Sequence, residues 1–196
     1  MPAPRLEFHP LTAERWGDLE RLFGERGACG GCWCMWWRLK RKDWEAGRGA
    51  SNKRRMKRLA GGDESPGLLA YADGEPIAWC AFEPREHYSA LDRSRILARV
   101  DERAVWSVTC FFVVKAWRGR GVSTALLREA ARSAAQRGAR VLEGYPHDLG
   151  GGTLPGPFVF TGLLAAFERA GFKEVARRSA KRPIVRKALR RPARPA

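Results

Sequence analysis

The feature that most constrains this chain is the stretch 106–138, where an apolar strand runs into an Arg/Gly-rich turn and then into a helix. Residues 106–114 read Trp-Ser-Val-Thr-Cys-Phe-Phe-Val-Val, and their near-continuous apolarity predicts a strand buried on both faces. After the turn, the Ala- and Leu-rich run 123–137 predicts a helix that Gly138 ends. Such a junction leaves several backbone N–H groups unpaired at the positive end of a helix.

The residues of this turn favour a phosphate ligand. Gly119 and Gly121 allow a ligand to approach the backbone closely. Arg118 and Arg120 add guanidinium groups whose fork suits phosphate oxygens. Because a helix N-terminus binds anions readily, the turn predicts a phosphate site.

The charge of the chain also points to an anionic partner. Its 196 residues include 37 Lys and Arg against 21 Asp and Glu, a net charge of +16, while 44% hydrophobic residues allow a full core. A nucleotide cofactor, a nucleic acid or a membrane surface would each suit this charge. The basic residues are scattered over 38–42, 53–58 and 177–191, so a nucleic acid ranks well below a nucleotide cofactor.

The cysteines indicate a reducing compartment. Cys29, Cys32, Cys34, Cys80 and Cys110 are odd in number, and neither a signal peptide nor an apolar run of membrane-spanning length accompanies them. We therefore expect reduced thiols, a cytoplasmic protein and no membrane partner.

Hydrophobic periodicity and turn residues divide the rest of the chain into short elements. Strands are expected at 5–10, 67–72, 76–82, 106–114, 139–145, 172–177 and 183–187, and helices at 11–23, 51–59, 123–137 and 162–170. The polar segment 83–104 is expected to be a loop with a helical piece at 94–100, and 188–196 a basic, disordered tail. This order predicts one domain over 1–187, a mixed α/β sheet with helices on both faces.

The central turn resembles the phosphate-binding signature of the GNAT N-acyltransferase superfamily. That signature is Arg or Gln, two residues, Gly, one residue, then Gly or Ala; here Arg118 begins it, Gly121 holds the glycine place and Ser123 takes the last. Val113 matches the apolar residue that ends the family's central strand. The run from Phe167 to Phe172 resembles the family's aromatic-x-x-x-Gly-Phe segment.

The resemblance covers roughly residues 66–187 and implies a fold and a cofactor. The implied fold is a mostly antiparallel central sheet with helices on both faces, with residues 1–65 supplying the first strand and the acceptor side. The implied co-substrate is acetyl-CoA. Its pyrophosphate would lie on the turn and its pantetheine arm along the central strand, which assigns cofactor binding to Phe112, Val113, Val114, Arg118, Gly119, Arg120, Gly121, Val122, Ser123 and Thr124.

The resemblance identifies the general acid and the general base of the acetyl transfer less clearly than it identifies the cofactor site. Many relatives place a tyrosine acid where this chain has Phe167, so Tyr145, at the end of the next strand, is the candidate proton donor. Relatives often use a glutamate base, and Glu83 is the first candidate here, with Glu143 and His147 as alternatives.

The segment 29–44 combines thiols with tryptophans and has two interpretations. Three cysteines within six residues could bind zinc, but such a site needs four ligands, usually in two separated pairs, so no metal is expected and a redox pair ranks lower still. Since this part of the family borders the acceptor pocket, Trp33, Trp36 and Trp37 could instead form an acceptor wall.

These observations predict an N-acetyltransferase that acts on an amine of a small molecule or a peptide, as a monomer or a homodimer. The alternative is a non-catalytic module on the same fold that senses acyl-CoA or binds nucleic acid. Phe167 in place of tyrosine favours the alternative slightly.

Overall fold

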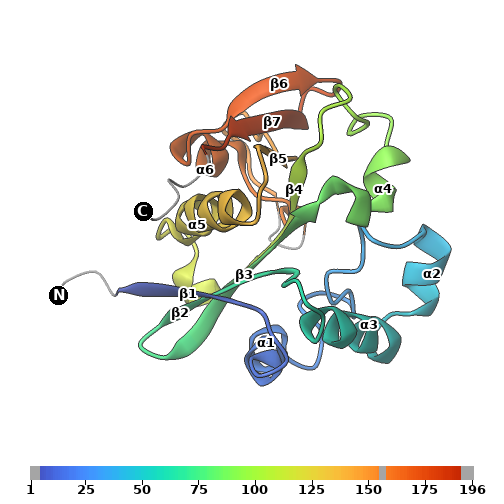
Figure 1. Ribbon diagram of the computed structural model, residues 1–196, viewed down its shortest axis with the longest axis vertical. Helices are drawn as coiled ribbons and strands as arrows, with labels where there is room; N and C mark the ends of the chain where they lie inside the picture. The colour runs from blue at the N-terminus through green and yellow to red at the C-terminus, as the bar shows by residue number, and fades with distance from the viewer. Residues whose placement is uncertain (1–4, 155–157, 191–196) are drawn as a thin grey trace.

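The computed structural model describes residues 5–154 and 158–190, which form a seven-stranded sheet with helices on both faces (Figure 1). The strand order is β1-β2-β3-β4-β5-β7-β6. Every neighbouring pair is antiparallel except β4 and β5, which are parallel. The strands are β1 (Leu6–Pro10), β2 (Gly67–Ala72), β3 (Glu75–Pro84), β4 (Trp106–Val113), β5 (Val141–Gly144), β6 (Lys173–Arg177) and β7 (Pro183–Ala188). The expected mixed, mostly antiparallel sheet is confirmed.

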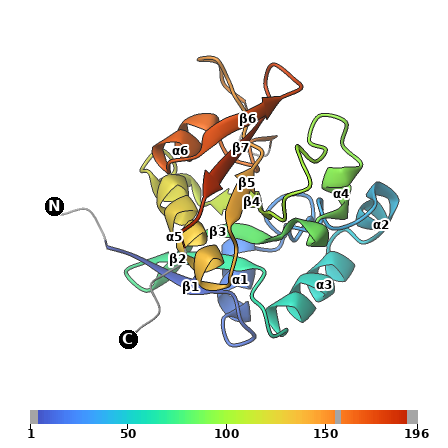
Figure 2. The same ribbon diagram turned by 45° about the horizontal axis from the view of Figure 1, so that its top comes forward.

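The helices divide between the two faces of the sheet, and Figure 2 shows α5 and α6 separated by the sheet from α2, α3 and α4. They are α1 (Trp16–Phe23), α2 (Arg41–Ala46), α3 (Ala50–Ala60), α4 (Ser89–Asp92), α5 (Val122–Gln136) and α6 (Leu164–Arg169), with 3-10 turns η1 (Arg85–His87) and η2 (Lys115–Trp117). In the described part of the chain, none of these helices has both the length and the apolarity to cross a bilayer.

Each face of the sheet has its own apolar core. On one face, the small side chains of α5, such as Ala130 and Ala134, let the helix pack closely on β2, β3 and β4. On the other face, Leu19 and Met56 from α1 and α3 pack with Trp79 of β3. Alternation along β3 explains the division, because successive side chains of a strand point to opposite faces.

The helical piece expected at 94–100 does not form. Leu97 is buried, and its carbonyl accepts a hydrogen bond from Arg85 at 2.9 Å. The carbonyls of Ala98 and Arg99 accept from Arg178 at 2.6 and 3.0 Å. Arginine side chains thus take the acceptors that a helix would supply to its own N–H groups, and the segment remains a loop.

Two further differences from the sequence concern α2 and the last strand. Residues 41–46 form a short helix that the Cys/Trp-rich pattern did not reveal. Strand β7 includes Ala188, so the expected tail begins later than predicted, and 191–196 lie outside the described residues.

Strands β4 and β5 separate soon after they meet. They pair only from Trp106 to Val108 of β4. At this point the register of β3 and β4 shifts, since Ala81 pairs with Cys110 but Phe82 pairs with Val108, which leaves Thr109 as an extra residue. A bulge of this kind bends a strand and ends local pairing. Beyond it, the side of β4 that faced β5 has no strand partner, and we call the space between the two separated strands the gap.

Candidate functional site

The Arg/Gly turn joins the open end of β4 to the start of α5, and its backbone donors are unpaired. Gly119 and Gly121 have φ values of +74° and +79°, which glycine adopts without strain. The first backbone bond of the helix runs from the N–H of Ala125 to the carbonyl of Gly121, at 3.0 Å. Within the described chain, no acceptor meets the N–H groups of residues 119–124, and the first turn of α5 carries no acidic side chain. The turn can therefore accept an anion.

The two arginines of the turn are exposed and partly fixed. The Nε of Arg118 donates to the carbonyl of Val113 at 2.9 Å. The guanidinium of Arg120 lies over the ring of Trp117, 5.4 Å from its centroid. The Arg118 side chain spans the turn and keeps other N–H donors available to a ligand.

The edge of β4 beside the gap has one clear position for a ligand amide. Val114 donates its N–H to Ile77 of β3 at 3.0 Å, so its backbone faces away from the gap. Phe111 faces the gap, and its N–H donates to the carbonyl of Phe160 at 2.6 Å. Because backbone groups alternate along a strand, Val113 faces the same way as Phe111. Of the three strand residues expected to guide pantetheine, Val113 is the one whose backbone N–H and carbonyl face this side.

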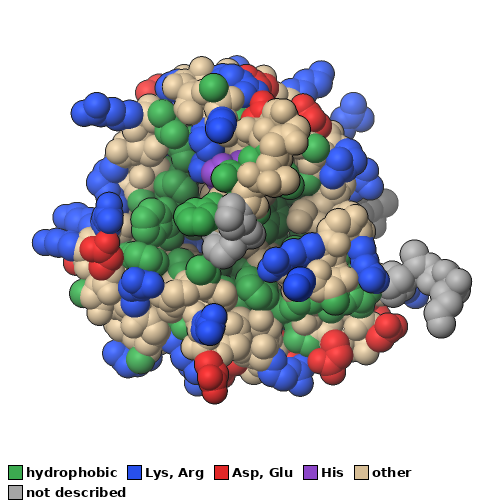
Figure 3. Space-filling view, turned by 180° about the vertical axis from the view of Figure 1, so that it is seen from behind, with side chains coloured by type: hydrophobic (Ala, Val, Ile, Leu, Met, Phe, Trp, Pro, Cys, Tyr) green, Lys and Arg blue, Asp and Glu red, His purple; other side chains and the backbone are tan. Residues whose placement is uncertain are grey.

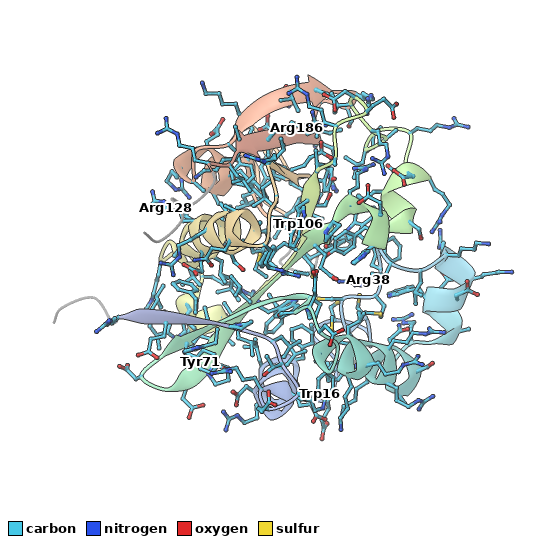
Figure 4. The ribbon with its side chains drawn as sticks, viewed as in Figure 1. Trp16, Arg38, Tyr71, Trp106, Arg128 and Arg186 are labelled. Carbon is cyan, nitrogen blue, oxygen red and sulfur yellow. The ribbon has the colours of Figure 1, made fainter. Side chains whose placement is uncertain are left out.

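Glu83 lies near the end of β3 in a buried ion pair. One carboxylate oxygen accepts from Nη2 of Arg38, and the other lies 2.9 Å from Nδ1 of His87. Burial alone would lower the pKa of Arg38, but the neighbouring Tyr88 and Glu83 raise it above its ordinary value. Figure 4 shows Arg38 beside the middle of the sheet. Glu83 is thus held rigidly by residues from two other segments.

Tyr145 is fully buried just beyond β5. Its hydroxyl accepts from Nη1 of Arg85 and donates to Glu143, both at 2.6 Å, and it shares a 2.7 Å hydrogen bond with Ser107. Burial, and then the neighbouring Glu143, raise the pKa of Tyr145 well above its ordinary value. The hydroxyl therefore keeps its proton and has three partners.

The two alternative bases are also occupied. Glu143 accepts from Nη1 of Arg85 at 3.0 Å and from Nε of Arg186 at 2.7 Å. His147 has Nε2 2.9 Å from the guanidinium of Arg182. Burial, together with Arg182, lowers the pKa of His147 to about 4. Neither group has a free basic atom.

The cysteines do not gather into a metal site. Among the described residues, no three side chains of His, Cys, Asp or Glu come together in a way that could hold a metal ion. The Sγ atoms of Cys34 and Cys110 lie 3.1 Å apart, whereas Cys32 accepts from Nε1 of Trp44 at 3.4 Å and Cys29 is exposed. Burial, and then the neighbouring Cys34, raise the pKa of Cys32 and of Cys80, so these thiols lie near the Cys34–Cys110 pair, away from Cys29.

The tryptophans of this segment take different places. Trp33 stacks on Trp16 at 5.7 Å in the core beneath α1. Trp37 is half-buried, and its ring lies 6.3 Å from that of Phe160, the residue that meets β4 across the gap. Trp36 packs edge-on against Trp37 at 6.4 Å. Trp36 and Trp37, but not Trp33, can border an acceptor.

The segment that follows β5 is unusually apolar on its surface. Among the described residues, most of the exposed large hydrophobic side chains belong to it: Leu154, Phe158 and Leu163. Seen from behind, hydrophobic side chains gather near the centre of the face, and many Lys and Arg side chains lie toward its edge (Figure 3). The sequence did not single out Phe160 or Arg38. For His87, the sequence offers one indication of a functional role, its position four residues after Glu83.

Comparison with protein families matches residues 33–148 to the acetyltransferase (GNAT) family. This range holds β2, β3, β4, the turn, α5 and β5. No curated protein sequence matches the chain.

Solved structures of low sequence identity share the fold. The GNAT domain of S. lividans PAT is 21% identical, with a TM-score of 0.52 and coverage of 94% of this chain and 90% of that one. The PaiA N-acetyltransferase from Thermoplasma acidophilum, in complex with coenzyme A, is 13% identical, with a TM-score of 0.53 and coverage of 94% and 99%. A GNAT-family acetyltransferase from Streptococcus pneumoniae gives 13% identity, a TM-score of 0.53 and the same coverage.

Proposed function

The chain belongs to the acetyltransferase (GNAT) family, acyltransferases that use acetyl-CoA, and we propose that it transfers an acetyl group from acetyl-CoA to an amine of a small molecule or a peptide. The observation that carries the proposal is the set of unpaired N–H groups at 119–124, placed between the open edge of β4 and the start of α5. The family match favours this enzyme over a non-catalytic binding module.

The donor would be held along one continuous path. The pyrophosphate would accept hydrogen bonds from the N–H groups of 119–124, with Arg118 and Arg120 beside it. The pantetheine arm would follow the edge of β4 at Phe112, Val113 and Val114, with its amide bonded to Val113. This path brings the thioester toward the bulge at Thr109, where β4 and β5 part.

The acid–base groups would come from the face of the sheet opposite α5. We propose that Glu83 belongs to the base that removes the ammonium proton and that Tyr145 provides the proton for the thiolate. Glu83 is in register with Ser107 of β4, and Ser107 hydrogen-bonds to Tyr145. A proton could therefore pass from Tyr145 through the Ser107 hydroxyl, although Tyr145 itself has no contact with solvent.

Surface charge limits the acceptor. The basic run 38–42 follows Trp36 and Trp37. Arg38 is buried against Glu83, but the exposed Lys40, Arg41 and Lys42 would repel a polycationic amine. We therefore propose an acceptor with few positive charges and an apolar part that contacts the tryptophans. All five cysteines are free thiols, which suits a reducing compartment such as the cytoplasm.

Calorimetric titration with acetyl-CoA tests the donor site. The double variant Arg118→Glu with Gly121→Glu should bind acetyl-CoA at least about tenfold more weakly, since it places two carboxylates where a pyrophosphate would lie. Arg132→Glu, an exposed change later on α5, is the matched control and should bind as the wild type does. Unchanged affinity in the double variant would show that the site is elsewhere. Thiol release over a panel of amines then identifies the acceptor.

A further inference from the structure

We propose that His87 is the base that receives the proton of the acceptor ammonium, and that Glu83 acts through it as a positioning residue. The proposal rests on the acetyl transfer proposed above and names the atom that performs one step of it. Its basis is a contact between two neighbouring segments, β3 and η1.

Glu83 and His87 form a pair in which only the histidine can reach a substrate. Nδ1 of His87 lies 2.9 Å from the Glu83 carboxylate. The side chain of His87 is 48% exposed, whereas that of Glu83 is 4% exposed. A carboxylate at Nδ1 selects the tautomer whose proton is on Nδ1, so the lone pair is on Nε2, the atom free to accept a proton.

Glu83 is itself fixed in place. Its second oxygen accepts from Arg38, whose guanidinium also lies over the ring of Tyr88, 4.6 Å from the centroid. Arg38 provides a countercharge that a buried carboxylate needs. With both oxygens engaged, Glu83 is suited to orient the imidazole and to stabilise its charged form, as a carboxylate does in other acid–base pairs.

The pair lies at the place where the thioester is expected. Glu83 is in register with Ser107, next to the pair formed by Phe82 and Val108 at which β4 and β5 part. Arg38 follows Trp37, whose ring packs near Phe160. Because α5 covers the opposite face, an acceptor that meets the thioester from this face would pass beside His87.

The other two histidines of the chain are not placed for this step. His147 has its ring nitrogen against Arg182, and its pKa is lowered to about 4. His9 lies on β1, the edge strand two strands away from β3. Its nearest charged group is Glu7, at 3.6 Å.

The step conserves protons and electrons. The acceptor R–NH₃⁺ gives one proton to Nε2 of His87, and the neutral amine uses its lone pair to form a C–N bond with the thioester carbonyl carbon. The C–S bond then breaks, and its electron pair leaves on the coenzyme A sulfur. Tyr145 gives a proton to that thiolate through Ser107, the second proton lost by the nitrogen replaces the one Tyr145 gave, and His87 returns its proton to solvent.

Two kinds of amine acceptor distinguish a role of His87 as a base from a purely structural role. At pH 7 most primary amines are protonated and need a base, whereas hydroxylamine is largely unprotonated and does not. His87→Gln should reduce coenzyme A release with the best primary amine of the panel by at least about 100-fold, but should change release with hydroxylamine little. His9→Gln is the matched control and should alter neither rate.

A conservative variant tests Glu83. With the primary amine, Glu83→Gln should lower kcat while keeping acetyl-CoA affinity, and it should change release with hydroxylamine little. Glu83→Asp, which keeps the carboxylate, should recover part of the lost kcat.

The outcomes divide clearly. Equal losses with both acceptors in His87→Gln would overturn the proposal. An unchanged kcat with the primary amine in Glu83→Gln would also overturn it, as would turnover of hydroxylamine but of no primary amine by the wild type. An absence of both acetyl-CoA binding and all thiol release in the wild type would instead refute the proposed transferase function.

Discussion

Replacing Glu143 by glutamine should test the network that joins β5 to its neighbours. The Glu143 side chain is 1% exposed and accepts hydrogen bonds from Arg85, Tyr145 and Arg186 at 3.0, 2.6 and 2.7 Å. Arg186 also donates to Asp101 at 2.7 Å. Glutamine keeps the volume of the side chain but removes its charge and turns one acceptor into a donor.

The expected loss of stability follows from the charges that remain. Arg85 is buried with its guanidinium against Glu143, so the variant leaves a buried cation with less countercharge. Breaking such a pair costs about 3–5 kcal/mol. In a domain of this size, each kcal/mol lowers Tm by about 2–4 °C, so Glu143→Gln should unfold about 6–20 °C below the wild type.

Thermal and urea unfolding followed by circular dichroism measure this difference. Glu129→Gln is the matched control, because Glu129 pairs only with the exposed Arg132 on α5 and should change the free energy of unfolding by less than about 0.5 kcal/mol. If Glu143→Gln were no less stable than Glu129→Gln, the buried pair would contribute nothing and the reasoning would be wrong.

Three further predictions concern single groups. The pKa of His147 falls from 6.5 to about 4 on folding, so the unfolded chain binds more protons than the folded chain between these pH values. In urea titrations, the stability advantage of the wild type over His147→Gln should therefore shrink as pH falls from 6.5 to 4. A difference that stays constant with pH would contradict the pKa shift. Gly121→Ala should destabilise the protein by about 1 kcal/mol because the φ of Gly121 is +79°, although nothing lies within 4 Å of the added Cβ. Gly17→Ala in α1, where the space is equally open but φ is ordinary, should stabilise the protein by about 0.5 kcal/mol. Equal effects of the two variants in calorimetric melting would refute this reasoning. Exposed Cys29 should react first with a thiol reagent at pH 8, while Cys32, whose pKa burial raises, should react slowly until the chain unfolds; mass spectrometry of the labelled peptides would reveal a different order.

Local patterns in the sequence predicted the strand, turn and helix of 106–138 well. The turn from Arg118 to Thr124 depends on neighbours in sequence: a strand, two glycines and a helix start. Nearly every strand followed from apolar runs and turn residues for the same reason. The residues assigned to acetyl-CoA remain a prediction.

The acceptor side depended on contacts that the sequence does not show. Arg38 and Glu83 are 45 residues apart, and nothing in either neighbourhood indicates their pairing. The loop at 94–100 has helical residues but gives its carbonyls to Arg85 and Arg178. Long arginine side chains override local propensity here, and the high arginine content of the chain makes such cases common.

The contact between Phe111 and Phe160 has a consequence for solubility. A strand edge with unpaired N–H groups is a template on which another chain can add a strand, and it promotes aggregation. The side of β4 beyond Val108 is such an edge, since pairing with β5 ends beside the bulge. The Phe160 carbonyl accepts from the Phe111 N–H at 2.6 Å, so one donor of this edge is occupied and less of the edge is left for another chain.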